Sequence, residues 1–313
     1  MSYQPAAPGD WGEMEEAPGI TVAREELLTA DNSPHFLRSW ETGSANALLI
    51  MHGLGGHSGW YIDMGNALAA QGLSVYAMDH RGFGRSGGFP GHIDDYQTFL
   101  QDIQFVLAAI RKRHPAGKIY LLGHSMGGLF AAHFAATHAN MLDGLILLNV
   151  WIQDTSKLRL LDSIAILLGG FFKSKHYWTT GNTATMTTNP QALQMLHADI
   201  YWRKQVTSSL LFQTLRMRLA MTSIAQTITL PTLMLQAEAD KAIIIKANQK
   251  FYEALASQDK TWKSYPNYGH DSEFEPDHSR LDADILAWIR QHASNKSSAS
   301  GASETTPRET SGA

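Results

Sequence analysis

The amino-acid sequence predicts an α/β fold in which a mostly parallel, doubly wound sheet carries an inserted helical cap. Continuous apolar runs of strand length recur along the chain, as expected for strands buried on both faces of a parallel sheet. Helical patterns separate these runs, which is typical of a doubly wound core. This rhythm stops between residues 151 and 226, where helical patterns follow one another without a clear strand.

The first elements are a hairpin and four buried strands. Thr21 to Leu28 and His35 to Trp40 flank Asp31-Asn32, which predicts an antiparallel hairpin at the sheet edge. Buried strands are then predicted at residues 47–51, 73–78, 119–122 and 145–148. Between the second and third of them, Asp94 to His114 has its apolar residues at helical spacing. Its two leading aspartates suit the positive end of a helix dipole, and Pro115 marks its end.

The second half of the chain supplies the cap and completes the sheet. Helices are predicted at residues 158–172, 191–198 and 208–221, strands at 232–236 and 261–265, and a last amphipathic helix at Leu281 to Ile289. The predicted organisation is an N-terminal extension (1–19), a core (20–150 and 227–293), the cap (151–226) and a tail (294–313). We expect the tail to be disordered because its Ser, Gly, Thr and Ala residues cannot bury enough apolar surface.

Composition excludes several classes of protein. Lys and Arg number 25 against 29 Asp and Glu, without a long basic run, which argues against a nucleic-acid partner. Cysteine is absent, which excludes disulfides, thiolate metal sites and cysteine nucleophiles. The first twenty residues do not resemble a signal peptide, and the longest nearly uncharged apolar stretch, Ser163 to Phe172, is half of a membrane span. We expect a cytoplasmic protein, with peripheral membrane contact through the cap left open.

Two segments match G-x-S-x-G, the pattern of a nucleophile elbow. Such an elbow needs a strand before the serine and a helix after it. Ser125 in Gly123-His124-Ser125-Met126-Gly127 meets both conditions, because it follows the strand at 119–122 and precedes Leu129-Phe130-Ala131-Ala132. Ser86 is followed by Gly88 and Pro90, which cannot continue as a helix. We therefore expect Ser125 to be the nucleophile and Ser86 to lie in a flexible loop.

A serine nucleophile requires a histidine that takes its proton and an acid that orients the histidine. In this kind of fold the order along the chain is serine, acid, histidine. Asp240 follows a late strand and is the expected acid, with Glu238 and Asp271 as competitors. His270 lies in a Pro- and Gly-containing loop after the last strand and is the expected base.

The third requirement is a pair of N–H groups that stabilise the oxyanion of the tetrahedral intermediate. One is expected from the residue after the nucleophile, Met126, and the other from a loop after an early strand. The glycine-rich turn at His52 to His57 occupies that place, and Leu54 is the expected second donor. The alternative is a tight glycine turn without a catalytic role.

At these motifs the sequence resembles the monoacylglycerol lipase and lysophospholipase branch of the α/β-hydrolases, which is grouped with the serine aminopeptidase S33 type. The resemblance extends from about residue 20 to residue 292 and rests on His52-Gly53-Leu54-Gly55, Asp79-His80-Arg81-Gly82-Phe83-Gly84-Arg85-Ser86, Gly123-His124-Ser125-Met126-Gly127-Gly128, Asp240 and His270. In the cap, Thr188-Asn189-Pro190 and Ala198-Asp199 are also similar to that branch, and most of the remaining cap sequence follows no motif. The resemblance implies the same nucleophile, acid, base and oxyanion donors, and an α/β-hydrolase fold.

The first helix of the cap is the segment that could indicate what is bound. It is apolar over much of its circumference and is followed by Lys173, Lys175 and Tyr177-Trp178, so it could rest on a lipid interface or line an acyl tunnel. The alternative is an ordinary helix packed on the core. The residues expected to contact substrate are Leu161, Ile164, Leu167, Leu168 and Phe171.

The sequence therefore predicts a serine hydrolase that cleaves carboxylic esters through an acyl-enzyme. Lipid-derived esters of the monoacylglycerol or lysophospholipid type are the expected substrates. No cofactor is expected, and no metal, because the histidines lack HExxH or similar ligand spacing. The alternatives are a peptidase, acyltransferase or carbon–carbon hydrolase of the same fold, or a non-catalytic ligand-binding module.

Overall fold

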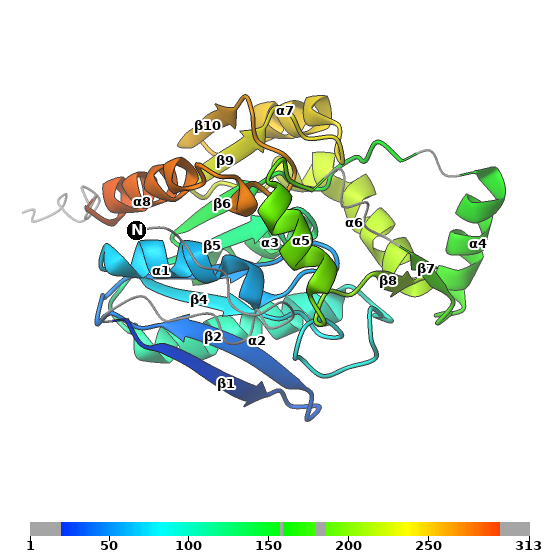
Figure 1. Cartoon of the computed structure of the whole chain (residues 1–313), viewed down its shortest axis with the longest axis horizontal. Helices are drawn as coiled ribbons and strands as arrows, with labels where there is room; N and C mark the ends of the chain where they lie inside the picture. The colour runs from blue at the N-terminus through cyan, green and yellow to red at the C-terminus, as the bar shows by residue number, and fades with distance from the viewer. Residues whose placement is uncertain (1–19, 157–158, 180–185, 295–313) are drawn as a thin grey trace, which may run out of the picture.

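The computed structural model describes residues 20–156, 159–179 and 186–294, and its centre is one eight-stranded sheet (Figure 1). The strands follow the order β1-β2-β4-β3-β5-β6-β9-β10. Their bounds are β1 (Val22–Leu28), β2 (Pro34–Trp40), β3 (Ala47–Met51), β4 (Ser74–Met78), β5 (Ile119–His124), β6 (Gly144–Leu148), β9 (Thr232–Ala237) and β10 (Lys260–Tyr265). β1 and β2 are antiparallel at one edge, and all pairs from β4 to β10 are parallel. The expected mostly parallel α/β sheet is confirmed.

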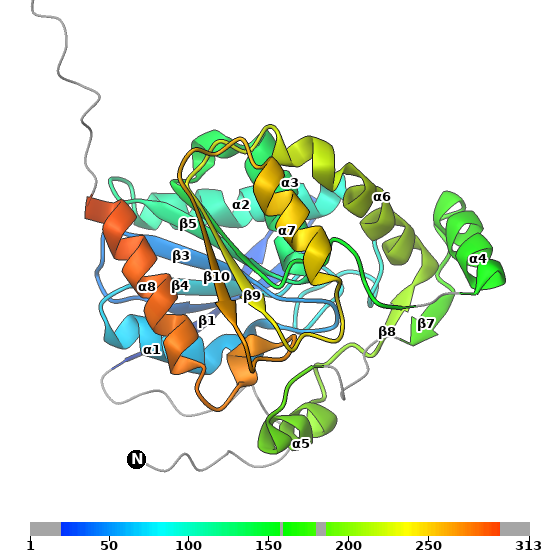
Figure 2. The same ribbon diagram turned by 90° about the horizontal axis from the view of Figure 1, so that it is seen from above.

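Helices cover both faces of this sheet (Figure 2). One face carries α1 (Ile62–Ala70) and α8 (Ser279–Ser294), and the other carries α2 (Gln97–Arg113), α3 (Met126–Thr137) and α7 (Ile245–Ala254). The predicted N-terminal extension and all but the first residue of the predicted tail lie outside the described residues.

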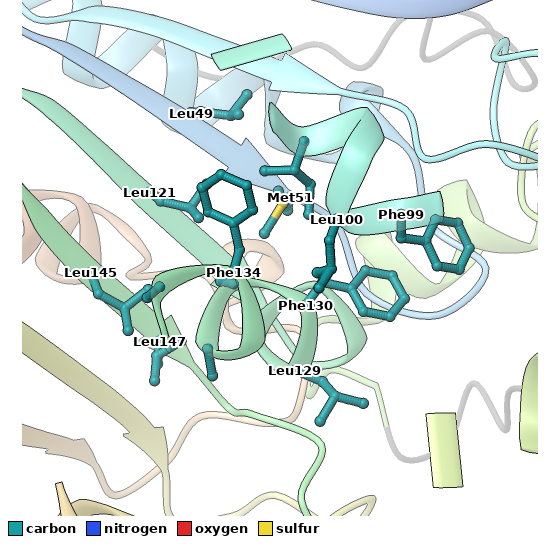
Figure 3. Close-up of a cluster of buried hydrophobic side chains, with 14 of the residues drawn as sticks. Leu49, Met51, Phe99, Leu100, Leu121, Leu129, Phe130, Phe134, Leu145 and Leu147 are labelled. Carbon is teal, nitrogen blue, oxygen red and sulfur yellow. The ribbon is translucent and has the colours of Figure 1, made fainter. Parts of the chain in front are cut away.

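Two apolar cores result from the alternation of side chains along each strand. Leu49 and Met51 of β3 point into the core beneath α2 and α3, where they meet Phe130 and Phe134 (Figure 3). Leu48 and Ile50 of the same strand point into the opposite core beneath α1 and α8. Because both faces are covered, the strands read as continuous apolar runs in the sequence.

The chain leaves the sheet after β6 and returns at β9. The intervening segment contains α4 (Leu160–Phe171), β7 (Tyr177–Thr179), α5 (Pro190–Ala198), β8 (Gln205–Thr207) and α6 (Ser208–Ala225). In Figures 1 and 2, α4 is the cap helix that projects farthest from the sheet. It packs closely on α6, since a Cβ atom at Gly170 would lie 2.1 Å from Cβ of Phe212.

Some elements differ from the sequence-based expectation. The expected absence of strands from the cap is wrong, because β7 and β8 form a small antiparallel sheet whose strands are too short to show a period. Helix α2 begins at Gln97 rather than Asp94, and the Asp95 carboxylate lies in the turn before the helix, where it accepts the N–H of Gln97 (3.0 Å). Helices α1 and α7 were not predicted, and α7 buries only Asn248 and Phe251 along its ten residues.

Candidate active site

Ser125 stands at the turn between β5 and α3. Its backbone has φ of 52° and ψ of −113°, a conformation that is rare for a residue with a side chain. The turn is also too tight for side chains at its flanking glycines: a Cβ atom at Gly123 would lie 2.3 Å from the Gly127 oxygen, and one at Gly127 would lie 2.3 Å from the Met51 oxygen. This is the geometry of a nucleophile elbow, which raises the serine hydroxyl above the carboxyl ends of the strands.

Ser86, in the second matching segment, has a different environment. Its hydroxyl donates to the carbonyl of Asp79 (2.7 Å) and accepts the N–H of Phe36 (2.9 Å). These bonds tie the loop after β4 to strand β2. The loop around Ser86 is therefore held in place rather than flexible, and its serine hydroxyl is occupied by the backbone.

The side chains of His270 and Asp240, which come from distant parts of the chain, lie beside Ser125. Nε2 of His270 lies 2.8 Å from the Ser125 Oγ, and Nδ1 of His270 lies 2.7 Å from Oδ2 of Asp240. Asp240 follows β9, and its Oδ1 accepts the N–H groups of Ala242 (2.8 Å) and Ile243 (3.2 Å). Serine, imidazole and carboxylate thus form one chain of hydrogen bonds, the arrangement that activates a serine hydroxyl.

The two competing acids do not reach the Nδ1 of His270. Glu238 is exposed at the end of the β9 segment. The Asp271 carboxylate lies beside another histidine, with Oδ1 3.6 Å from Nε2 of His124. Of the three acids that the sequence left open, only Asp240 contacts the imidazole of His270.

Electrostatics favour the protonated form of His270. Burial alone would lower the pKa of this imidazole, but the charge of Asp240 and its hydrogen bond outweigh burial, and the Asp271 charge adds to them. The pKa of His270 is therefore raised above its ordinary value of 6.5. Stabilisation of an imidazolium is what a general base needs once it has taken the serine proton.

A buried asparagine that the sequence did not reveal holds the loops of the acid and the base. Nδ2 of Asn149 donates to the His270 carbonyl (2.6 Å) and to Ser272 Oγ (2.8 Å), and its Oδ1 accepts the N–H of Ala237 at the end of β9 (2.7 Å). Asn149 has φ of 44°, in the left-handed region that asparagine tolerates better than most residues. No sequence pattern marks such a residue, because its partners lie about 90 and 120 positions away.

A second group of buried acids lies behind His270. Burial raises the pKa of Asp271, and burial together with the charge of Asp271 raises the pKa of Glu273. His124 lies between them, with Nδ1 3.1 Å from the Tyr61 hydroxyl and 3.4 Å from Oε1 of Glu273.

Within the described ranges, His124, His270 and Asp271 are the only group spaced to hold a metal ion. Both ring nitrogens of His270 already serve Ser125 and Asp240, so this group belongs to the serine site.

The two predicted oxyanion donors flank Ser125. Met126 is the first residue of α3, where an N–H has no partner within the helix. Leu54 belongs to the loop after β3, which passes so near the nucleophile that a Cβ atom at Gly53 would lie 3.2 Å from Cβ of Ser125. The N–H of Leu54 bonds to no residue that the structure describes. Both amides are thus available beside the serine, as an oxyanion hole requires.

A cavity of about 530 Å³ opens over the triad, between the core and the cap. Ser125, His270 and Leu54 lie on its core side. The cap contributes mainly large apolar side chains, among them Ile166, Trp178, Trp202, Leu211 and Leu215. Arg218 and Asp154 also line it, and they form an ion pair with Nη1 and Oδ2 2.8 Å apart. The cavity is therefore largely apolar, and its charged lining consists of this ion pair together with Lys241 and Asp271.

The cap residues that were expected from the sequence to contact substrate do not line this cavity. Their side chains on α4 are turned to the surface, and the exposed fractions are 77% for Leu161, 42% for Ile164, 45% for Leu167, 57% for Leu168 and 76% for Phe171. From the same helix it is Ile166, 5% exposed, that reaches the cavity. Because α4 contacts its neighbours through one narrow side, most of its apolar surface points outward.

Comparison with known proteins agrees with this geometry. A family model described as serine aminopeptidase, S33, matches residues 43–277. A monoglyceride lipase of Mus musculus is 29% identical over 248 residues, which are 78% of this chain and 82% of that protein. An uncharacterized abhydrolase domain-containing protein of Dictyostelium discoideum is 29% identical over 284 residues, which are 88% of this chain but 30% of that longer protein.

A solved structure extends the likeness to the fold. A soluble variant of monoglyceride lipase from Saccharomyces cerevisiae, in complex with a substrate analogue, superposes with a TM-score of 0.79. The match covers 92% of this chain and 99% of that one at 18% identity, which supports the fold alone. Since the family model spans well over half of the sequence, the chain belongs to the serine aminopeptidase S33 family and is a hydrolase of the α/β-hydrolase fold.

Proposed function

We propose that this hydrolase cleaves carboxylic esters of the monoacylglycerol type through an acyl-enzyme. The observation that carries the proposal is the Ser125–His270–Asp240 chain of hydrogen bonds at the floor of a largely apolar cavity. Similarity to the monoglyceride lipase of Mus musculus supports the substrate class.

Each residue has a defined role in the proposed reaction. Oγ of Ser125 attacks the ester carbonyl while Nε2 of His270 takes its proton, and Asp240 stabilises the resulting imidazolium. The N–H groups of Leu54 and Met126 donate to the oxyanion of the tetrahedral intermediate. His270 then protonates the leaving alcohol, and a water molecule repeats the sequence on the acyl-enzyme.

The cavity suits a single acyl chain. Its apolar side chains would remove the chain from water, and each buried methylene contributes about 0.8 kcal/mol. Two carboxylates line the cavity, and neither is a free, fully ionised group of the kind that an aminopeptidase needs to hold an ammonium group. Asp154 is paired with Arg218, and burial raises the pKa of Asp271.

We further propose that the surface of α4 contacts lipid. Seven of the eleven exposed large apolar side chains among the described residues lie between Leu160 and Phe172. Lys173 and Lys175 follow directly, as in helices that lie at a membrane surface. No described helix is both long and apolar enough to cross a bilayer. This surface would bring the cap to membranes that contain the substrate.

A substrate series tests the proposed function. We expect kcat/KM to rise with acyl length from p-nitrophenyl acetate to long-chain monoacylglycerols, by up to about fourfold for each buried methylene. The Ser125→Ala variant provides the background rate. Aminoacyl p-nitroanilides should not be cleaved above that background. Efficient cleavage of these amides with weak ester hydrolysis would assign the chain to a peptidase instead.

A further inference from the structure

A short segment of the cap is bound to the loop that carries Leu54. Residues Asp199 to Arg203, which follow α5, lie against the glycine-rich loop that runs from Gly53 to Trp60. The Asp199 side chain is buried there, with 5% of the residue exposed. A buried carboxylate is stable only where hydrogen bonds replace its water, so its partners identify what it holds.

Two of the three partners of Asp199 lie on the glycine-rich loop of the core. Its Oδ2 is 2.8 Å from Nε2 of His57 and 2.8 Å from Nε1 of Trp60, and its Oδ1 accepts the N–H of Tyr201 (2.9 Å). Nδ1 of His57 accepts the N–H of Gly59 (3.0 Å), so Nε2 of the neutral ring carries the proton and donates to Asp199. Burial alone would raise the pKa of Asp199, but the bonds from His57 and Trp60 lower it overall, which keeps the carboxylate ionised.

Backbone contacts continue this attachment next to Leu54. The N–H of Arg203 donates to the carbonyl of Gly55 (2.8 Å), and Gly55 itself has φ of 82°. A Cβ atom at Gly55 would lie 2.6 Å from the Arg203 oxygen. Leu54 is therefore fixed on both sides, by Gly53 against the nucleophile and by Gly55 against the cap.

We propose that Asp199 is a positioning residue through which the cap fixes the oxyanion loop, the glycine-rich loop from Gly53 to Trp60 that carries the Leu54 N–H. Its carboxylate holds His57 and Trp60, and this bond keeps the Leu54 N–H directed at the space above Ser125. The inference rests on the roles proposed for Ser125 and Leu54. It gives the cap a part in catalysis that is independent of its contacts with the acyl chain.

This role predicts an effect on the turnover of esters too short to reach the apolar cap. Loss of one oxyanion donor lowers kcat by about 10²–10³-fold in other hydrolases, and a loosened donor should cost less. For Asp199→Asn with p-nitrophenyl acetate, we expect kcat to fall by about 10- to 100-fold while KM changes less than about threefold. A boronic acid that forms a tetrahedral adduct with the serine should bind more weakly by a similar factor, because it uses the same donors.

A control variant separates this effect from general loosening of the cap. Tyr177 on β7 also joins cap and core, since its hydroxyl donates to the carbonyl of Pro90 (3.0 Å), but it does not touch the oxyanion loop. Tyr177→Phe should leave kcat and boronic acid affinity within about twofold of the parent. Melting temperatures of both variants show whether the fold is retained.

The outcomes separate the possible roles of Asp199. If Asp199→Asn keeps the parent kcat, whether or not its KM rises, the positioning role is wrong, even if monoacylglycerol hydrolysis is confirmed. If Asp199→Asn does not fold, the same comparison is made with His57→Phe, which removes the charged bond from the other side. An unchanged kcat in that variant would equally overturn the proposal. Failure of the parent protein to hydrolyse any ester would instead contradict the proposed function.

Discussion

At the scale of single residues, the site depends on one strained backbone position and on the charges around one imidazole. The conformation of Ser125 is tolerated because the glycines beside it allow strand, turn and helix to pack in contact. The hydrogen bond between Asp240 and Nδ1 of His270 fixes the ring so that Nε2 faces the serine hydroxyl. Replacing Asp240 with Asn would remove the negative charge and would no longer hold the imidazole in the tautomer that can accept the serine proton. The same replacement lowers kcat by about 10⁴-fold in other triads.

The pH dependence of the rate follows from the environment of His270. Only neutral His270 can accept a proton, so kcat/KM should fall on the acid side with an apparent pKa above the ordinary value of about 6.5. The groups that face the ring are Ser125, Asp240, Asp271 and His124. Because the Asp271 carboxylate favours the imidazolium, Asp271→Asn should lower the pKa of His270 and move the acid limb to lower pH. A pH profile of ester hydrolysis measures this.

Glu238→Gln is the matched control for the pH experiment. Glu238 is exposed and does not contact His270, so its neutralisation should leave the acid limb in place. A shift of the acid limb to higher pH in Asp271→Asn would contradict the assigned electrostatics. A dead Glu238→Gln enzyme beside a normal Asp240→Asn enzyme would move the acid to Glu238.

The sequence could identify residues with a motif or a fixed order, but not residues defined by contacts. Ser125, Asp240 and His270 follow from an elbow pattern and from the positions of late strands. Asn149 carries no such pattern. Ala198-Asp199 resembles the monoacylglycerol lipase branch, but this resemblance gives Asp199 no role, because Asp199 acts through partners on other elements. Their importance becomes visible only when burial and hydrogen bonds are known.

At the scale of secondary-structure elements, prediction succeeded where the core imposes a period. The buried strands of the sheet and the amphipathic helix α8 were predicted within a few residues. Short elements and elements that bury few side chains were missed, such as the three-residue strands of the cap and α7. Helix α1 was missed although Ile62, Met64 and Leu68 are buried in the core. Helix α4 was predicted, but the sequence could not show which of its side chains face the cavity. Most residues of this helix are apolar and lie on every side of it, so no polar face marks the orientation.

The exposed apolar side of α4 leads to a prediction about lipid. Leu167 is 45% exposed on α4 and does not line the cavity, so Leu167→Glu should change stability little. Burial of a leucine in an apolar phase contributes about 1.5–3 kcal/mol, and the added charge opposes insertion further. We expect binding to phospholipid vesicles, and hydrolysis of long-chain monoacylglycerol within them, to fall by about 10- to 100-fold. Hydrolysis of p-nitrophenyl acetate should stay near the parent rate.

Leu28→Glu is the control for this experiment. Leu28 is 61% exposed on the edge strand β1, outside the cap, and its replacement should affect neither vesicle binding nor hydrolysis. Equal losses on vesicle-bound and soluble esters in Leu167→Glu, with a lowered melting temperature, would show that α4 serves the packing of the cap rather than contact with lipid.

At the scale of the whole molecule, the sheet positions the catalytic residues and the cap encloses the cavity above them. The sheet brings the nucleophile, acid and base together at the carboxyl ends of β5, β9 and β10, where an open α/β sheet places its site. The cap covers this end and encloses an apolar cavity of about 530 Å³. On this account, binding of the acyl chain depends mainly on the cap. The chemistry depends on Ser125, His270 and Asp240, and the cap assists it by positioning the Leu54 N–H through Asp199.

Labelling with a serine-directed fluorophosphonate, located by mass spectrometry and followed by rate measurements, tests this account most directly. We predict a single label on Ser125 in the parent protein. Ser125→Ala should lose the label and about 10⁶ in kcat while keeping its melting temperature. Ser86→Ala should be labelled normally and keep its activity, with some loss of stability because Ser86 bonds to Asp79 and Phe36. A label on another residue, or ester hydrolysis that survives in Ser125→Ala, would contradict the account.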